Sequence, residues 1–238
     1  MSKEILIAPQ HNDILIKPYD MNFEKISVQK SEKQSLLDQI NTPDFISALN
    51  AANKLTRLGG GKTAVAWKME TTLGDTPFAF ARKQFQSGNI NQINHESVVL
   101  TKIQSIEGVP TLLQKTNTFI DIELIKGVPL GKMTPAERKT IPRPCVVDFF
   151  HTLIKIAAHG IINSDLNVNN ILYDSINQKL TLVDFGGATI CEDAEPKKEQ
   201  LKFVLLGLKK LFPNFQEFDN FYQLINIEHQ KLTKKMNP

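Results

Sequence analysis

The chain has 238 residues, of which 41% are hydrophobic and 22% are charged, and this composition is typical of a soluble globular protein. Collagen-like, low-complexity and disulfide-scaffold classes are excluded, because the two cysteines, Cys145 and Cys191, lie far apart and outside any CxxC or Cys/His metal spacing. The formal net charge of +3 is too small for the basic footprint of a nucleic-acid-binding protein, so we expect no nucleic-acid partner.

Residues 1–53 are predicted to be an N-terminal extension. Its start carries Pro9, His11, Asp13 and Lys17 between short apolar stretches, so it lacks the apolar region of a Sec signal peptide. No apolar run in the sequence approaches the roughly 20 residues that span a bilayer, and we expect no membrane insertion. These features favour the cytoplasm. Further on in the extension, apolar residues at helical spacing predict two short helices.

Residues 54–125 predict a small antiparallel sheet with one helix. Three segments rich in β-branched and aromatic residues are separated by glycine-containing turns, and this pattern is typical of consecutive antiparallel strands. A helix is predicted at about 92–105, and residues 110–125 supply two further strands. The first three predicted strands are residues 54–58, 63–72 and 78–85.

Residues 126–238 change to a mainly helical pattern. Apolar residues at positions i, i+3 and i+4 predict a helix over 146–157, which Gly160 ends. Two short strands and two more helices follow, at about 169–174, 179–185, 196–211 and 215–234. The predicted fold class is therefore α+β, with two unequal lobes.

Three consecutive glycines, Gly59, Gly60 and Gly61, admit two interpretations. A Walker A loop is excluded, because it needs a glycine where this chain has Thr56 and because it leads into a helix, whereas a strand follows here. A Gly-rich turn of the GxGxxG type between two strands would let backbone N–H groups approach phosphates, although Ala64 stands at its third glycine position. A plain glycine hairpin is the other interpretation.

A second polar cluster surrounds Asp165 and Asn170, and it is followed by Asp184. Two carboxylates and an amide oxygen at the rims of a small hairpin would supply hard oxygen ligands for Mg²⁺ and a carboxylate able to accept a hydroxyl proton. The alternative interpretation of these residues is that they form polar turns that bind no ligand. A calcium loop starting at Asp165 is excluded, because its sixth position is Asn170 instead of Gly and its twelfth is Ile176 instead of Glu.

These motifs resemble the protein-kinase-like superfamily, which combines a Gly-rich loop, an AxK lysine on the third strand, a helix glutamate, a catalytic loop with Asp and Asn, and a DFG motif. The resemblance covers residues 58–188, in which Ala-Arg-Lys at 81–83 matches AxK and Asp-Phe-Gly stands at 184–186. It implies a bilobed fold with an N-lobe over 54–125 and a C-lobe over 126–238, truncated after the activation segment.

The resemblance also implies a role for each motif residue, with ATP and Mg²⁺ as cofactors and Mn²⁺ as an alternative ion. Lys83 would bind the α- and β-phosphates, and Glu96 would hold that lysine, although Glu107 fits an amphipathic helix nearly as well. Asp165 would be the catalytic base, and Asn170 and Asp184 would ligate the metal. Further nucleotide contacts would come from Gly59, Gly60, Gly61 and the hinge backbone at Glu123 and Leu124.

The chain departs from the family pattern in two places. Residues 163–165 read Asn-Ser-Asp where the family has His-Arg-Asp, and no Ala-Pro-Glu motif follows residues 184–186. This trimming resembles minimal bacterial kinases, including lipopolysaccharide, RIO-like and secreted effector kinases. A virulence effector of this kind would reach the cytoplasm of a host cell without a Sec signal.

Three functions therefore stand as hypotheses. The leading one is a serine/threonine protein kinase with a protein substrate, which for an effector would belong to a host cell. The second is a small-molecule kinase with a sugar-type acceptor. The third is a pseudokinase that binds nucleotide or a partner without transfer, which Ala64 and Ser164 favour.

Overall fold

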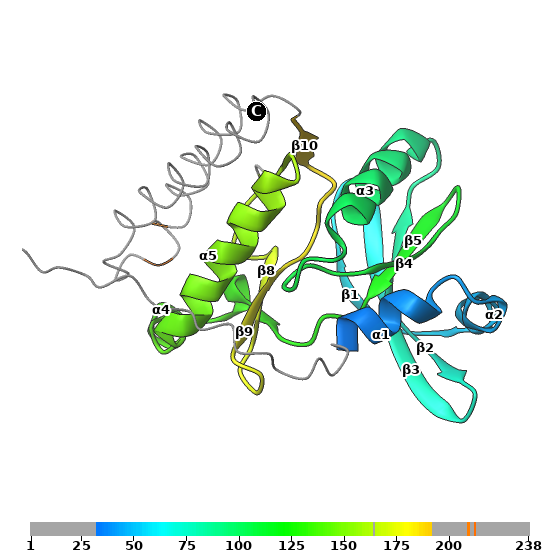
Figure 1. The fold of residues 1–238 in the computed structure, drawn as a ribbon, viewed down its shortest axis with the longest axis horizontal. Helices are drawn as coiled ribbons and strands as arrows, with labels where there is room; N and C mark the ends of the chain where they lie inside the picture. Colours follow the sequence, from blue (N-terminus) through cyan, green and yellow to red (C-terminus); the bar gives the residue numbers. More distant parts are fainter. Residues whose placement is uncertain (1–31, 164, 192–208, 210–211, 213–238) are drawn as a thin grey trace, which may run out of the picture.

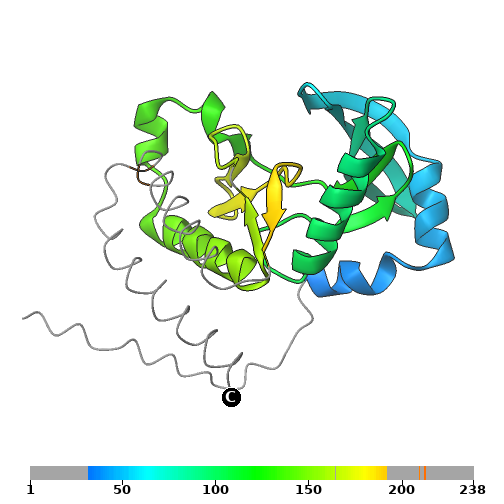
Figure 2. The same ribbon diagram turned by 90° about the horizontal axis from the view of Figure 1, so that it is seen from above.

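The computed structural model describes residues 32–163, 165–191, 209 and 212. A five-stranded antiparallel sheet with its helices comes first in the chain, and a second part with a long helix and short strands follows (Figure 1, Figure 2). The predicted α+β, protein-kinase-like fold class is confirmed. We call the two parts the N-lobe and the C-lobe. The helices predicted near 196–211 and 215–234 lie, apart from residue 209, outside the described residues.

The N-lobe sheet has the strand order β1-β2-β3-β5-β4, with antiparallel neighbours throughout. A tight turn joins β2 to β3 at Gly74, whose φ of +59° favours glycine. Helix α3 (Ile90–Ile103) connects β3 to β4 and lies two residues earlier than the predicted helix. The strands are β1 (Asn53–Gly60), β2 (Ala64–Leu73), β3 (Thr76–Phe85), β4 (Leu112–Lys115) and β5 (Phe119–Glu123).

Helices α1 (Glu32–Gln39) and α2 (Pro43–Asn50) are the two predicted helices of the extension. Thr42 caps α2, because its side chain accepts a hydrogen bond from the Phe45 backbone N–H at 3.4 Å. The predicted extension thus includes helices that pack on one face of the N-lobe sheet. The buried residues of this contact are Ile40, Phe45, Leu49, Met69, Phe80 and Leu113.

The strand register determines which side chains share a face of the sheet. On β3, Phe80 and Arg82 point to the face that α2 covers, so Lys83 points to the opposite face. Lys83 is paired with Ala66 on β2, and Ala66 is paired with Gly59 on β1. These three residues therefore form one row on the face away from α2.

A buried ion pair joins β3, β5 and α2. The Arg82 guanidinium donates to both carboxylate oxygens of Asp121, at 2.7 and 2.8 Å, and to the Leu49 carbonyl oxygen at 3.3 Å. Asp121→Ala would leave this cation without its partner in a region of low dielectric constant. We expect the substitution to lower the free energy of unfolding by about 3–5 kcal/mol in a urea titration.

The Lys68–Glu70 pair on β2, at 2.8 Å, is the matched control because both side chains are solvent-accessible. Glu70→Ala is expected to cost less than about 1 kcal/mol. The double variant Arg82→Met/Asp121→Leu removes both buried charges and should recover most of the lost stability. Equal losses for Asp121→Ala and Glu70→Ala would contradict the role of the buried pair.

The C-lobe is built on helix α5 (Arg143–Ala158), which begins three residues before the predicted helix. The chain leaves α5 through Gly160, whose φ is +77°. Among the described residues, no helix has the length and apolar character needed to span a bilayer. The strands pair as β6-β8-β9 and as β7-β10. The other elements are β6 (Val128–Pro129), η1 (Leu130–Lys132), α4 (Pro135–Lys139), β7 (Ile161–Asn163), β8 (Ile171–Asp174), β9 (Lys179–Leu182) and β10 (Ala188–Ile190).

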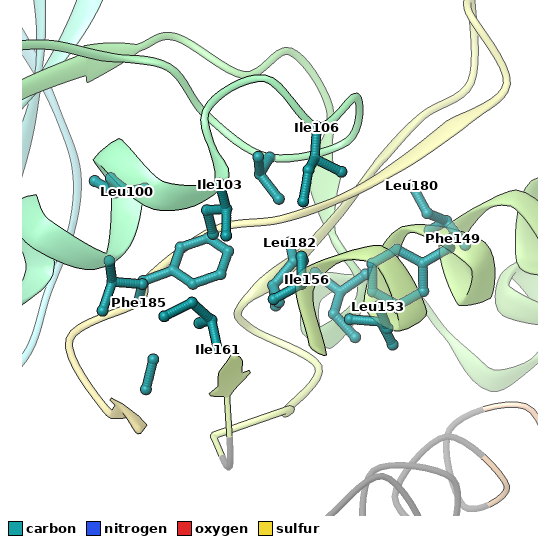
Figure 3. Close-up of a cluster of buried hydrophobic side chains, with 14 of the residues drawn as sticks. Leu100, Ile103, Ile106, Phe149, Leu153, Ile156, Ile161, Leu180, Leu182 and Phe185 are labelled. Atoms are coloured by element: carbon teal, nitrogen blue, oxygen red, sulfur yellow. The ribbon is translucent and has the colours of Figure 1, made fainter. Parts of the chain in front are cut away.

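One hydrophobic core runs from α3 into the C-lobe (Figure 3). Phe185 is fully buried and lies between Ile103 of α3 and Ile161 of β7. Because close-packed interiors resist displacement of their side chains, Phe185 fixes the backbone beside it. The preceding residue, Asp184, is thereby held where the two lobes meet.

Candidate active site

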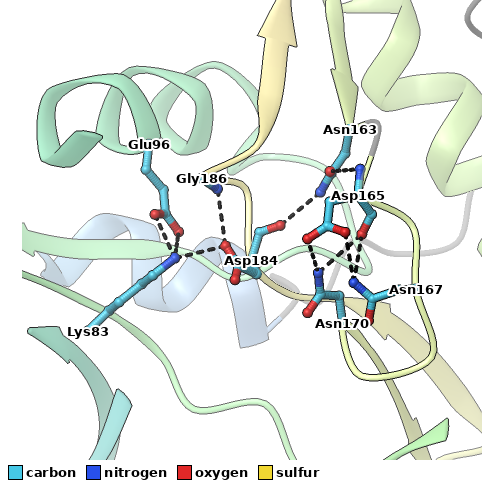
Figure 4. Close-up of polar contacts among 8 residues, drawn as sticks. All are labelled: Lys83, Glu96, Asn163, Asp165, Asn167, Asn170, Asp184 and Gly186. Carbon is cyan, nitrogen blue, oxygen red and sulfur yellow. Dashed lines mark hydrogen bonds and ion pairs between the residues drawn. The ribbon is translucent and has the colours of Figure 1, made fainter. Parts of the chain in front are cut away.

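Lys83 forms ion pairs with two acidic side chains from different lobes (Figure 4). Its Nζ donates to the two carboxylate oxygens of Glu96 on α3, at 2.9 and 2.7 Å, and to Asp184 Oδ1 at 2.8 Å. Glu107, the alternative in the sequence, instead accepts a hydrogen bond from Lys179 at 3.1 Å on the surface. The structure thus brings Lys83, Glu96 and Asp184 together.

Lys83 and Glu96 are shielded from water, and Glu96 is only 1% exposed, whereas the Asp184 side chain is 45% exposed. Burial opposes the charge of Lys83, but attraction to Glu96 and Asp184 outweighs it and raises the pKa of Lys83 above its ordinary value. Burial likewise opposes the charge of Asp184, yet Lys83 holds the pKa of that carboxyl below its usual range. Burial raises the pKa of Glu96 against the attraction of Lys83. The lysine is therefore kept protonated, as binding of an anionic phosphate requires.

Asp184 has a left-handed backbone conformation with φ of +69°, which few non-glycine residues adopt. Its Oδ1 accepts a hydrogen bond from the Gly186 N–H at 3.1 Å. A Cβ on Gly186 would lie 3.2 Å from Glu96 Oε2 and 3.3 Å from Asp184 Oδ1, so glycine is the residue that fits beside the cluster. A backbone strained in this way is typical of functional sites.

The carboxylate of Asp165 accepts hydrogen bonds on both oxygens (Figure 4). Asn167 Nδ2 donates to Oδ1 at 2.9 Å, and Asn170 Nδ2 donates to Oδ2 at 3.0 Å. Asn170 Nδ2 also reaches the Asp165 carbonyl oxygen at 3.1 Å. Because the nitrogen of the Asn170 amide is directed at Asp165, its oxygen is the atom left to ligate a metal.

Asn163 connects the two acidic residues. Its Oδ1 accepts a hydrogen bond from the Asp165 backbone N–H at 3.0 Å, and its Nδ2 donates to the Asp184 carbonyl oxygen at 2.8 Å. From the sequence, Asn163 was noted only as a departure from the family motif. Asn167 was considered only as the third position of the calcium loop that was excluded. The feature of the sequence that could have identified Asn163 is its place at the end of a buried apolar strand, because a buried amide must find hydrogen-bond partners.

Two adjacent turns carry oxygen atoms that could ligate a divalent metal. The Val183 N–H donates to the Asn170 carbonyl oxygen at 2.8 Å, which places Asn170 beside the residue that precedes Asp184. One carboxylate and one amide oxygen fit Mg²⁺, which completes its shell with waters and substrate phosphates. Within the described part of the chain, no three His, Cys, Asp or Glu side chains form a metal cluster. The donor set therefore suits a metal that is bound together with phosphates.

The three predicted loop glycines differ in their surroundings. A Cβ on Gly59 or Gly61 would meet no atom within 4 Å, whereas a Cβ on Gly60 would lie 2.7 Å from the Arg57 guanidinium. The Gly61 N–H donates to the Ala64 carbonyl oxygen at 2.9 Å and so closes the hairpin between β1 and β2. Space for a ligand is thus open beside Gly59 and Gly61, but the Gly61 N–H is already used in the turn.

Glu123 ends β5, and Leu124 follows it in the predicted hinge. The Glu123 side chain is turned away from the hinge backbone, because its Oε2 accepts hydrogen bonds from Thr111 N and Thr111 Oγ1 at 3.1 and 2.9 Å. Its backbone N–H donates to the Thr111 carbonyl oxygen at 2.9 Å. Adenine binding by this hinge therefore stays a prediction for the remaining backbone groups of Glu123 and Leu124.

Parts of the chain are similar to one protein family and to one known protein. The model of the ABC1 atypical kinase-like domain family matches residues 99–210. The probable serine/threonine-protein kinase fnkB of Dictyostelium discoideum is 30% identical over 99 residues, which is 38% of this chain and 18% of that protein. The chain thus matches less than a fifth of the length of this relative. The family match includes Asp165, Asn170 and Asp184 but begins after Lys83 and Glu96.

The fold and both matches support a relationship to the protein-kinase-like superfamily. The resemblance to the protein-kinase-like superfamily that the sequence showed is thereby supported. The finer RIO-like, lipopolysaccharide-kinase-like or effector subtype has no counterpart in these two matches.

Proposed function

We propose that the chain is an ATP- and Mg²⁺-dependent kinase that phosphorylates serine or threonine hydroxyl groups of a protein. The observation that carries the proposal is the bridge from Lys83 to Glu96 and Asp184. A lysine held protonated by a helix carboxylate and aligned with a possible metal ligand is what phosphoryl transfer from ATP needs. The name of the Dictyostelium discoideum relative, a probable serine/threonine-protein kinase, supports a serine or threonine acceptor.

Each side chain has a defined task in this proposal. Lys83 neutralises phosphate oxygens of ATP. Asn170 and Asp184 would hold Mg²⁺, which when bound offsets the negative charge of the phosphates. Asp165 accepts the proton of the acceptor hydroxyl. Gly59, Gly61, Glu123 and Leu124 are the remaining proposed nucleotide contacts.

The acceptor class can be tested with γ-labelled ATP, Mg²⁺ and cell lysates, with the Asp184→Asn variant as the inactive control. We expect label on protein bands with the wild-type chain only. Label on small molecules would favour the sugar-type kinase, and an absence of transfer with retained nucleotide binding would favour the pseudokinase. A host protein as acceptor is a prediction from the sequence alone, and stronger labelling in a eukaryotic than in a bacterial lysate would support it.

ATP with Mg²⁺ is expected to raise the melting temperature of the protein. At a free ligand concentration 100 times Kd, the stabilisation would be about 2.7 kcal/mol. Asp184→Asn removes the charge of a proposed metal ligand and should lose most of the shift. Asp75→Asn, in the exposed turn between β2 and β3, should keep it. An equal shift in the wild-type and Asp184→Asn proteins, measured by differential scanning fluorimetry, would place the metal site elsewhere.

A further inference from the structure

Lys33 of α1 is a buried charged residue outside the proposed active site. Its side chain is 7% exposed, and its Nζ donates to the Val109 carbonyl oxygen at 2.6 Å. The same Nζ lies 3.8 Å from Glu123 Oε2. Because burying an ammonium group is costly unless it is paired and hydrogen-bonded, these two contacts are what allow a lysine at this place.

Glu123 is in turn locked to the connection between α3 and β4. Its Oε2 accepts hydrogen bonds from the N–H and the hydroxyl of Thr111, which is fully buried. Lys33 is the cation beside this carboxylate, and it also holds the connection itself at Val109. One side chain of α1 therefore joins the end of β5 to the segment that continues α3.

The same connection carries contacts to the C-lobe. The Leu182 N–H donates to the Gly108 carbonyl oxygen at 3.2 Å, and Thr152 Oγ1 donates to the Glu107 carbonyl oxygen at 3.1 Å. Gly108 has a φ of +88°, and a Cβ there would lie 3.0 Å from Thr152 Oγ1. Residues 107–111 are thus a junction of α1, β5, α5 and β9.

We propose that Lys33 is a positioning residue through which α1 braces this junction and sets the nucleotide-binding geometry of the N-lobe. The proposal rests on the proposed function, because α3 carries Glu96 and the end of β5 is the predicted hinge. When the charge of Lys33 is removed, Glu123 and the 107–111 segment lose their shared cation. The Glu96–Lys83 pair and the hinge are then less firmly held, while Asp165 in the C-lobe keeps its own hydrogen bonds.

Hydrogen exchange without nucleotide tests the brace itself. In Lys33→Met, which keeps the apolar stem, amide exchange should rise about tenfold or more in peptides covering 104–112 and 119–127. Lys115→Met, on the exposed end of β4, is the matched control and should leave both peptides unchanged. Glu123→Gln is a second variant that removes the ion pair from the other side and should produce the same pattern. Faster exchange confined to residues 32–39, or none, would overturn the proposal.

Steady-state kinetics tests the consequence for the nucleotide. Lys33→Met should raise the KM for MgATP about tenfold and leave kcat within about twofold, because ground-state binding is lost and the base is untouched. An unchanged KM in an active enzyme, or equal falls in kcat for Lys33→Met and Lys115→Met, would also overturn the proposal. If the wild-type chain neither binds nor uses ATP, the proposed kinase function fails, and the exchange experiment still decides whether Lys33 braces the junction.

Discussion

Asp165→Ala is expected to lower the kcat of phosphotransfer by about 10²- to 10⁴-fold while the affinity for MgATP stays close to that of the wild type. The rate falls because the acceptor hydroxyl loses the carboxylate that takes its proton. The affinity stays because Asn170 Nδ2 still donates to the backbone carbonyl of residue 165, at 3.1 Å in the wild type. The oxygen of the Asn170 amide therefore keeps its direction toward the proposed metal.

The more conservative variant Asp165→Asn is expected to affect MgATP binding as well as the rate. Both oxygens of Asp165 accept hydrogen bonds from amide NH₂ groups, so an asparagine at this position would set one NH₂ group against another. Asn170 could relieve the clash by rotating its amide, and its oxygen would then turn away from the metal. We therefore expect Asp165→Asn to weaken MgATP binding more than Asp165→Ala does.

The measurement is a pair of assays on both variants, turnover with the identified acceptor and MgATP affinity by calorimetry. Wild-type turnover in Asp165→Ala would remove this residue from the catalytic role. Asn177→Ala, in the exposed turn between β8 and β9, is the control that should change neither quantity by more than about twofold.

Local patterns in the sequence predicted most of the fold. The strands β2 and β3 followed from β-branched and aromatic runs between glycine turns, and α5 from its apolar spacing ahead of Gly160. The packing of α1 and α2 on the sheet did not follow, because an apolar stripe on a short helix does not identify the surface that covers it. Lys33 was missed for a related reason, since an isolated lysine in a polar helix gives no sign of burial.

Candidate site residues could be named from the sequence where a motif fixes the spacing between them. They could not be chosen where only tertiary contacts determine which side chains meet. Asp165, Asn170 and Asp184 stood in one short segment and were named from it. The choice between Glu96 and Glu107 depended on which carboxylate lies near Lys83. Glu107 lies beyond the end of α3 at Ile103, and only the structure pairs Lys83 with Glu96. The use of the Gly61 N–H in the hairpin was likewise hidden, because it depends on the turn that closes β1 onto β2.

Lys83→Met is expected to abolish nucleotide binding and also to destabilise the fold. The substitution leaves Glu96, which is 1% exposed, without its cation beside the second carboxylate, Asp184. Breaking a buried pair by removing one partner costs about 3–5 kcal/mol of unfolding free energy. The double variant Lys83→Met/Glu96→Gln removes the stranded charge as well, so it should regain most of the stability while binding no ATP.

The pH dependence of stability distinguishes a stranded charge from a simple loss of packing. Burial already raises the pKa of Glu96 in the wild type, and without Lys83 the attraction that most strongly opposes this effect is lost, which leaves only the backbone hydrogen bond from Phe185. A carboxyl whose pKa is higher in the folded than in the unfolded state contributes stability below its unfolded pKa of about 4.3, and that stability is lost as the pH rises through the folded value. The deficit of Lys83→Met relative to wild type should therefore be small at pH 5 and grow toward pH 8, by up to about 1.4 kcal/mol per pH unit. Urea titrations at the two pH values measure it, with Lys83→Met/Glu96→Gln as the control whose deficit should grow less than that of Lys83→Met. A Lys83→Met deficit of the same size at both pH values would mean that Glu96 is not stranded by the loss of Lys83.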